Sequence, residues 1–330
     1  MRSRRHIATI SLAIGVLGNL ALPFIASGAT SPAPANAPGS GEGLELSPPI
    51  VQLSADPGQT IVTNIRIRNI TQENLYATPV ADDFGAKGEN GDPQILLDET
   101  QATRYSLKYW IEGMAPILLV PNEIKTASVK IVIPANAEPG GHYGVVRFTA
   151  TPAGLEGSGV ALSASIGTLI LLRVNGPVTE KLSLVDMFLS KNGTTGSFFE
   201  NGPLMITQRI SNSGTVHLEP IGSVIVTNMF GKKIASLDIN NPPRNILPDS
   251  IRRFDETLTS TWMFGRYTAS LKVTYGQTNG SFVTSLSFWV IPWKLLLISL
   301  VLIIIFLFGL RFAVRRYNQY IIAQARRAKK

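Results

Sequence analysis

The chain has 330 residues, of which 45% are hydrophobic and 16% charged, and its 30 Lys and Arg against 22 Asp and Glu give a net charge of +8. The surplus of basic residues lies at the two ends of the chain, so it predicts membrane topology and gives no support to nucleic-acid binding. Cysteine is absent. An exported chain of this composition must be stabilised by its core, which favours a bacterial cell surface over an animal immunoglobulin ectodomain.

The N-terminus has the order of a secretory signal peptide. Arginines come first, an apolar stretch from Ile7 to Ile25 follows, and small residues end at Ala29. We therefore assign residues 1–29 to the signal, with cleavage after Ala29 or, as an alternative, after Ala37. Residues 30–43 are rich in Ser, Pro, Ala and Gly, a composition that predicts a flexible linker.

The middle of the chain alternates between apolar and polar residues with a period of two. The first example has one face that is mostly apolar and one that is polar: Ile61, Thr63, Ile65 and Ile67 against Asn64, Arg66 and Arg68. This pattern predicts a half-buried strand. Comparable strands are predicted at 127–133, 144–150, 168–174, 204–210, 223–228, 266–275 and 281–290. Asn-Gly pairs at 90–91, 192–193, 201–202 and 279–280 predict tight hairpins between strands.

Two segments depart from this alternation. Ala102 to Glu112 carries apolar residues that form one face of a short helix, or it is an irregular connection between strands. Gly85 to Pro93 is rich in Gly, Asn and Asp and is predicted to be a loop.

An internal repeat divides the body of the chain. A strand ending in Asn69 leads to a Pro-Asn-Glu strand start and later to Tyr143, and a strand ending in Asn212 leads to Pro248-Asp-Ser and then to Tyr267. The same order in both parts predicts an all-β fold of two immunoglobulin-like β-sandwich domains, residues 44–176 and 177–287, with their boundary near Gly176.

A second apolar run, Phe288 to Leu310, is 23 residues long, enough for a transmembrane helix that crosses the lipid bilayer. Trp289 and Trp293 suit the outer aromatic belt, and Lys294 can extend its ammonium to the headgroups. Residues 311–330 form a basic tail without Asp or Glu. Because positive segments stay in the cytoplasm, the sequence predicts a single-pass type I protein whose body is extracytoplasmic.

No catalytic set is evident, and we predict that the chain is not an enzyme and binds no cofactor or metal. The predicted mature body holds only His142 and His217, which we interpret as residues of a tight turn and of a hairpin. Ser158 lacks the outer glycines of a hydrolase elbow. No residue is therefore assigned to a catalytic, cofactor-binding or metal site.

One cluster of acidic residues could bind calcium, but the stronger interpretation is that they are solvated residues of turns. The cluster consists of Asp82, Asp83, Glu89, Asn90 and Asp92, and its spacing does not match a calcium loop.

The first half of the body contains a set of short motifs: Arg68-Asn69, Ser106-Leu107 with Trp110-Ile111, the Pro-Asn-Glu start, and the segment from Ile133 to Val146 that contains Pro-Gly-Gly-His-Tyr-Gly. In these motifs the chain resembles the WxL-interacting protein family of bacterial surface proteins. The resemblance implies immunoglobulin-like domains that bind peptidoglycan and partner or host proteins. It also implies a C-terminal transmembrane helix with a basic tail, and it implies no ligand residue in this chain.

These observations predict a non-catalytic, membrane-anchored surface protein that binds cell-wall polymer or other surface proteins. We expect the loop from Phe84 to Gln94 to carry specificity, because it looks longer than a hairpin needs. The alternative is an extracytoplasmic chaperone or assembly factor that acts by β-strand addition. A strand edge left unpaired in the first domain would favour that alternative.

Overall fold

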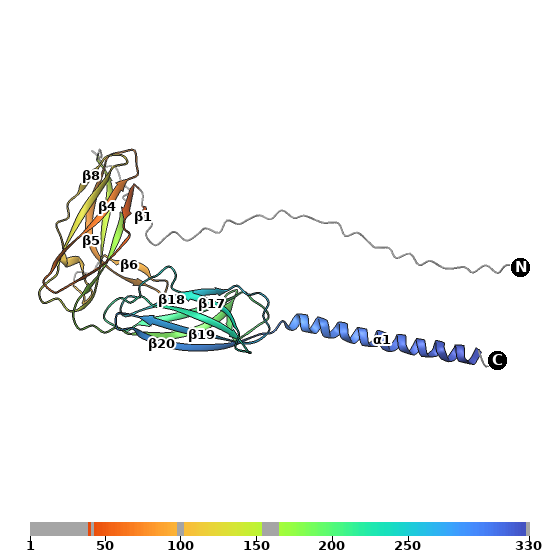
Figure 1. Ribbon diagram of the computed structural model, residues 1–330. Coiled ribbons are helices and arrows are strands. Elements are labelled where there is room, and N and C mark those ends of the chain that lie inside the picture. Colours follow the sequence, from red (N-terminus) through yellow and green to blue (C-terminus); the bar gives the residue numbers. More distant parts are fainter. Residues whose placement is uncertain (1–38, 41–42, 98–101, 154–164, 328–330) are drawn as a thin grey trace. The chain divides into compact units, whose positions relative to one another are not determined.

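The computed structural model describes residues 39–40, 43–97, 102–153 and 165–327. The predicted signal peptide, both cleavage sites and Ser158 lie outside the described residues. The described part of the chain is mostly β-sheet and ends in one long helix, so the predicted fold class is confirmed at this level (Figure 1).

The N-terminal half, defined here as β1 to β11, contains two sheets. One has the order β1-β2-β4-β9-β7, and the other has the order β3-β11-β10-β5-β6 with β8 also paired to β5. Neighbouring strands are antiparallel except for β3, which runs parallel to β11. The strands are β1 (Gly39–Ser40), β2 (Leu44–Ser47), β3 (Ile50–Ala55), β4 (Thr60–Asn69), β5 (Leu75–Lys87), β6 (Asp92–Leu96), β7 (Ile111–Glu112), β8 (Ile117–Leu119), β9 (Ile124–Val132), β10 (Gly140–Pro152) and β11 (Ser165–Val174).

The C-terminal half, β12 to β20, forms two further sheets, with the orders β13-β12-β15-β18 and β14-β20-β19-β16-β17. No strand of one half pairs with a strand of the other in the described residues. The strands are β12 (Leu182–Lys191), β13 (Thr194–Gly196), β14 (Phe198–Phe199), β15 (Leu204–Asn212), β16 (Ile221–Asn228), β17 (Lys233–Ile239), β18 (Ser250–Leu258), β19 (Gly265–Tyr275) and β20 (Gly280–Val290).

Each half encloses its own apolar core between its two sheets. β4 shows how the sequence determines this packing: Ile65 and Ile67 are fully buried, while Arg66 and Arg68 on the other face are exposed. Their partners across the N-terminal core include Phe148 and Leu172, from the opposite sheet. Because side chains alternate between the two faces of a strand, each sheet has one apolar face, and the apolar faces of the two sheets pack together to form the core.

The repeat seen in the sequence has a structural counterpart in two buried asparagines. The amide nitrogen of Asn69 donates to the carbonyls of Glu73 (2.7 Å) and Leu119 (3.1 Å), and its carbonyl oxygen accepts from the Thr71 N–H (2.9 Å). Asn212 repeats the arrangement, donating to the carbonyls of Val216 and Ile246 (2.8 Å each) and accepting from the Gly214 N–H (2.9 Å). Each asparagine thereby ties the end of one strand to a distant segment of the same half.

Three predictions about local structure need correction, and one alternative that the sequence left open is decided. Gly85 to Pro93 is largely strand, because β5 and β6 form a hairpin joined by a turn at residues 88–91. For Ala102 to Glu112 the irregular connection is the alternative observed, with one 3₁₀ turn (Lys108–Trp110) before β7. Asn201-Gly202 lies in a connection between two different sheets and closes no hairpin. The predicted linker ends earlier, since Gly39–Ser40 pairs with β2.

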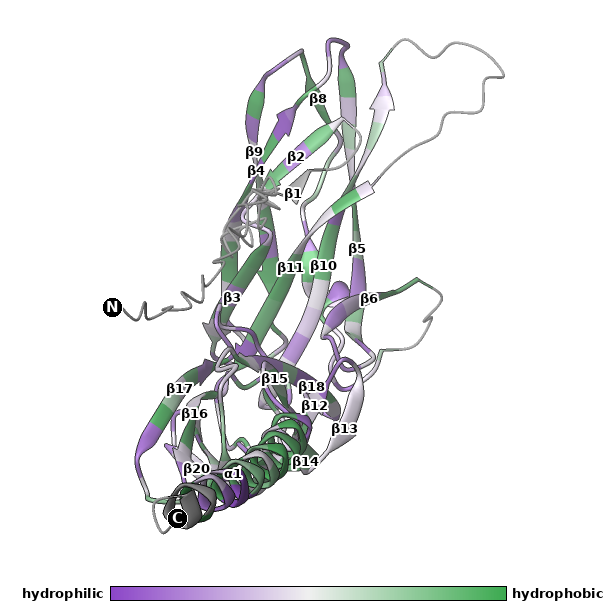
Figure 2. Ribbon diagram, turned by 90° about the vertical axis from the view of Figure 1, so that its right-hand side faces the viewer, coloured by the Kyte–Doolittle hydropathy of each residue, from purple (hydrophilic) through white to green (hydrophobic). Residues whose placement is uncertain are grey.

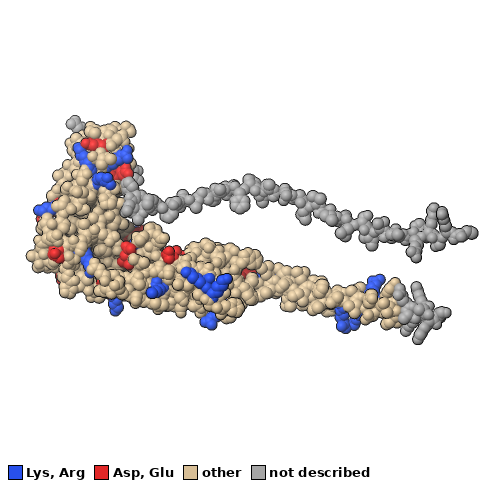
Figure 3. Space-filling model, in the orientation of Figure 1, with Lys and Arg blue, Asp and Glu red and all other residues tan. Residues whose placement is uncertain are grey.

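The C-terminal helix α1 (Trp293–Arg327) begins later than the predicted span. Phe288 and Val290 are fully buried residues of β20, so their apolar character serves the core and not a membrane. A stretch from Trp293 to Ile322 is long and apolar enough to cross a bilayer, with a mean hydropathy of 2.9 in its most apolar window. In Figure 2 much of its ribbon is coloured as hydrophobic, and in Figure 3 basic side chains are visible toward the C-terminal end of its described part.

Candidate functional site

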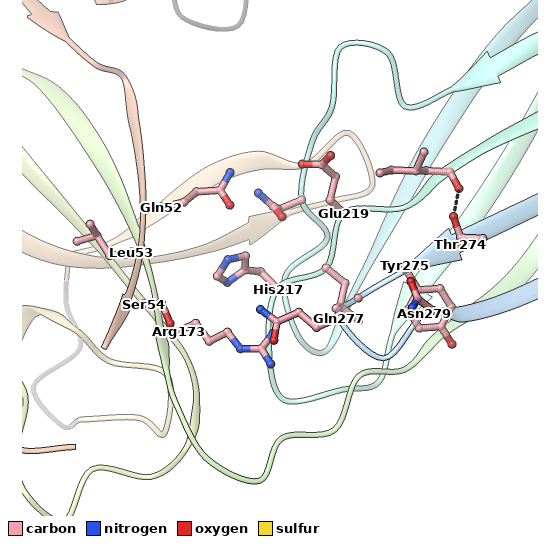
Figure 4. A pocket seen from close by; sticks show the side chains of 14 residues that line it. Gln52, Leu53, Ser54, Arg173, His217, Glu219, Thr274, Tyr275, Gln277 and Asn279 are labelled. Atoms are coloured by element: carbon pink, nitrogen blue, oxygen red, sulfur yellow. Dashed lines mark hydrogen bonds between the residues drawn. The ribbon is translucent and has the colours of Figure 1, made fainter. Parts of the chain in front are cut away.

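A cleft of about 520 Å³ lies between the two halves and is lined by residues of both. β3 contributes Gln52, Leu53 and Ser54, and Arg173 comes from the end of β11. The facing residues are His217, Leu218 and Glu219 from the β15–β16 connection, with Ile221, Asn245, Thr274, Tyr275, Gly276, Gln277 and Asn279. Figure 4 shows Gln52 on one side and His217 and Glu219 on the other, with their side chains directed into the space between them.

The outer edge of β3 forms one wall of this cleft. The Leu169 N–H donates to the Pro49 carbonyl (2.9 Å) and the Asn175 N–H to the Ala55 carbonyl (2.8 Å), which fixes how β3 faces β11. Because alternate residues bond the neighbour in a parallel pair, the main-chain groups of Gln52 and Ser54 face away from β11. β3 is the last strand of its sheet, so these groups have no partner strand among the described residues.

Arg173 is an arginine of the cleft whose side chain is held in place by an ion pair with Glu180. Its guanidinium donates to Glu180 Oε1 (2.8 Å), and the side chain of Glu180 is only 1% exposed. Burial raises the pKa of Glu180, but hydrogen bonds from Thr278 and Arg173 outweigh it and lower the pKa below its usual value. Glu180 is therefore ionised at neutral pH, and the ion pair orients Arg173.

His217 contributes a neutral imidazole to the same cleft. Burial, with a smaller contribution from the Arg173 charge, lowers the pKa of His217 to about 4. Its Nδ1 lies 3.4 Å from the hydroxyl oxygen of Tyr143, a buried residue of the N-terminal half. A neutral ring in this position offers hydrogen bonds to a ligand without adding charge.

The two histidines considered for chemistry from the sequence belong to different halves of the chain. His142 is a buried residue of β10, which corrects its assignment to a turn, and its ring packs against Trp110 at 4.3 Å between centroids. His217 lies in a connection between sheets rather than in a hairpin. Within the described residues, no group of three or more His, Cys, Asp or Glu side chains is arranged to hold a metal ion.

Three carboxylates of the acidic cluster accept hydrogen bonds from protein groups, although Asp83 Oδ2 is buried without a partner among the described residues. Asp82 accepts two hydrogen bonds from Arg147 (2.8 and 2.6 Å), and Asp83 accepts from the N–H groups of Leu107 and Lys108 (2.8 and 2.9 Å). Glu89 pairs with Arg209 of the C-terminal half. The segment from Phe84 to Gln94 therefore belongs to a hairpin that contacts the other half, which corrects its description as a loop longer than a hairpin needs.

Sequence reasoning missed the cleft, although one signal for it was present. In residues 50–55, Val51, Leu53 and Ala55 alternate with the polar residues Gln52 and Ser54, a period-two pattern that would have placed β3. Its parallel pairing with β11, which begins at Leu169↔Ile50, joins residues far apart in the chain. No local pattern encodes such a pairing, so the free edge was not foreseeable.

Comparison with protein-family models finds no match, and neither does comparison with curated proteins. Solved structures with a similar arrangement include the YadV chaperone (12% identity, TM-score 0.35, covering 74% of this chain and 99% of that chain). The class 5 fimbriae chaperone CfaA (13%, TM-score 0.37, 73% and 98%) and the Pseudomonas aeruginosa chaperone CupB2 (11%, TM-score 0.31, 73% and 96%) are also similar. These values describe a distant similarity.

Proposed function

We propose that this chain is a membrane-anchored, exported binding protein built from two immunoglobulin-like sandwiches, and that it captures an extended segment of another exported protein. The captured segment adds as a strand to the free edge of β3, inside the cleft between the halves. The observation that carries this proposal is that the main-chain groups of Gln52 and Ser54 face away from β11, on a strand whose residues line the cleft.

Strand addition suits this edge for physical reasons. Main-chain N–H and C=O groups supply affinity for any extended peptide, and pockets for alternate side chains supply selectivity. The cleft provides such a surface opposite β3, where Ile221 is 63% exposed. This function is the alternative that the sequence left open, and it now has a specific edge to support it.

The proposed location rests on both ends of the chain. The N-terminal pattern of a signal peptide and the apolar helix α1 support export followed by anchoring. Arg311, Arg315 and Arg316 follow the most apolar part of α1 and support a cytoplasmic C-terminus. The resemblance to the WxL-interacting protein family is part of this proposal, as the surface location is common to both.

Cell-wall polymer is a second candidate for the same cleft. Its lining includes the amide side chains of Gln52, Asn245, Gln277 and Asn279 together with Tyr275. Amides and an aromatic ring are suited to sugar hydroxyls, which need both donors and acceptors. In this case recognition depends on side chains rather than on the edge of β3.

Substitutions at position 52 separate the two modes. In the full chain, Gln52→Pro removes the N–H that faces away from β11, and proline is tolerated at such an edge position. Gln52→Ala removes the side chain and keeps the N–H. A photoreactive residue in place of Ile221 would report the captured protein in cells, and the peptide attached to it would be identified by mass spectrometry.

Strand addition predicts that Gln52→Pro lowers cross-linking by roughly tenfold or more while Gln52→Ala changes it little. Melting curves of both variants should match the parent, which separates loss of binding from loss of fold. Equal losses for the two variants, with reduced retention on isolated cell wall for Gln277→Ala, would favour the polymer. Unchanged cross-linking in Gln52→Pro would refute the proposed edge.

A further inference from the structure

The two ends of the C-terminal half differ sharply in chemistry. The end that lines the cleft carries polar residues in its connections, among them Glu219, Asn245 and Gln277. The opposite end, which we call the helix end, is where β20 finishes at Val290 and α1 begins at Trp293. A difference of this kind along one sandwich indicates two different environments.

Large apolar side chains are exposed at the helix end. Phe230 is 83% exposed in the β16–β17 turn, and Trp262 is 85% exposed in the β18–β19 connection. Other apolar residues of this end that are about half exposed are Phe198, Met229, Phe264 and Trp289. Burying an aromatic side chain is favourable, so a set of them left in water indicates a surface that is covered in use.

Strand register places these residues beside the start of α1. Gly265 is opposite Val290, Phe198 is opposite Trp289, and Asn228, which precedes the turn, is opposite Tyr267. The side chain of Met229 packs so closely on Gly265 that a Cβ there would lie 2.5 Å from its terminal methyl carbon. The turn and the β18–β19 connection therefore flank the point at which the chain leaves the sheet.

The passage from β20 to α1 is short and hydrogen-bonded. The Ile291 N–H donates to the Phe199 carbonyl (2.8 Å), and the Trp293 N–H donates to the Ile291 carbonyl (2.8 Å). Lys294, in the first turn of α1, pairs with Glu200 beside β14 at 2.8 Å. If α1 crosses a bilayer, these links hold the helix end of the sandwich close to its surface.

We infer that the helix end of the C-terminal half is seated in the headgroup layer of the bilayer, with Phe230 and Trp262 as its aromatic anchors. This inference rests on the proposed membrane anchor. Aromatic side chains favour the membrane interface, and the exposed basic residues Lys232 and Arg266 at the same end suit anionic headgroups. The contact fixes how the body stands on the membrane and leaves the cleft at the far end of this half open to a partner.

The absence of cysteine allows site-specific labels to test the contact in the full chain. Single variants Lys232→Cys and Thr261→Cys place an environment-sensitive fluorophore beside each anchor while both aromatics remain. Gln277→Cys labels the cleft end as the control, and Leu302→Cys labels α1. The protein is reconstituted in vesicles of phosphatidylcholine and phosphatidylglycerol, with or without lipids that carry a nitroxide quencher.

The inference predicts that labels at 232 and 261 are quenched by headgroup nitroxides, that the label at 277 is not, and that the label at 302 is quenched by acyl-chain nitroxides. Combining Phe230→Ser with Trp262→Ser should reduce quenching at 232 and 261. The matched pair Ile221→Ser with Val283→Ser, which removes residues 63% and 69% exposed elsewhere on this half, should not.

The outcomes distinguish this inference from the proposed membrane anchor on which it rests. Quenching at 302 with none at 232 or 261 would overturn the seating and leave the anchor intact. Absence of quenching at 302 as well would overturn both. Energy transfer between labels on separate chains, without lipid quenching at 232 and 261, would identify a second copy as the covering partner and would also overturn the inference.

Discussion

At the scale of single residues, a few buried polar groups determine how the strands end. Asn69 and Asn212 occupy equivalent places in the two halves, and each makes hydrogen bonds to three main-chain groups. An unsatisfied buried group costs more free energy than a hydrogen bond contributes net. These asparagines therefore stabilise the fold through the segments that they connect.

Replacing either asparagine should be strongly destabilising. Asn69→Ala or Asn212→Ala is expected to lower the free energy of unfolding by about 2 to 4 kcal/mol, because main-chain donors and acceptors lose their partners. Chemical denaturation of the full chain in detergent would measure this. Asn64→Ala, at an exposed site of β4, is the control and should change stability by less than about 0.5 kcal/mol. Equal effects at Asn64 and Asn69 would contradict this role.

At the scale of elements, the alternation of apolar residues predicted strands well. The faces of β4 are as the sequence indicated, with Ile65 and Ile67 at 0% exposure. The start of α1 was misplaced because Phe288 and Val290 are apolar residues of a sheet core. An apolar sequence pattern does not tell whether a residue is surrounded by protein or by lipid. The cleft was missed because it depends on a parallel pairing between distant strands, β3 and β11.

The assignment of faces in β4 can be tested directly. Ile65→Asp places a carboxylate in the N-terminal core without a partner and should cost several kcal/mol, on the order of 3 to 5. Arg66→Asp, one position along on the exposed face, should cost less than about 1 kcal/mol. Thermal melts of the two variants would measure the difference. Similar melting temperatures for the two variants would mean that the face is wrongly assigned.

At the scale of the whole molecule, the charge distribution predicts which side of the membrane each part occupies. The arginines at 311, 315 and 316 follow the apolar part of α1, whereas all four sheets precede it. Since basic segments are retained in the cytoplasm, the body should lie outside and the C-terminus inside.

Protease added to intact spheroplasts should digest the body and leave an epitope at the C-terminus protected. Detergent-treated spheroplasts provide the control, because both parts should then be cleaved. Protection of the body in intact cells, with loss of the C-terminal epitope, would reverse the orientation and refute the proposed location.

The two parallel strand pairs have a consequence for the order in which the chain can fold. β3 pairs with β11, and β14 pairs with β20 through Phe198 and Trp289. In each half, an earlier strand therefore pairs with the last strand of that half. Because the chain is synthesised from its N-terminus, this pairing cannot form before the last strand has been made. The second closure needs Val290, which lies just before α1. The C-terminal half can therefore complete its sheet only after the segment next to the helix has been synthesised. If α1 crosses a bilayer, as proposed, this last step of folding takes place as the chain reaches the membrane.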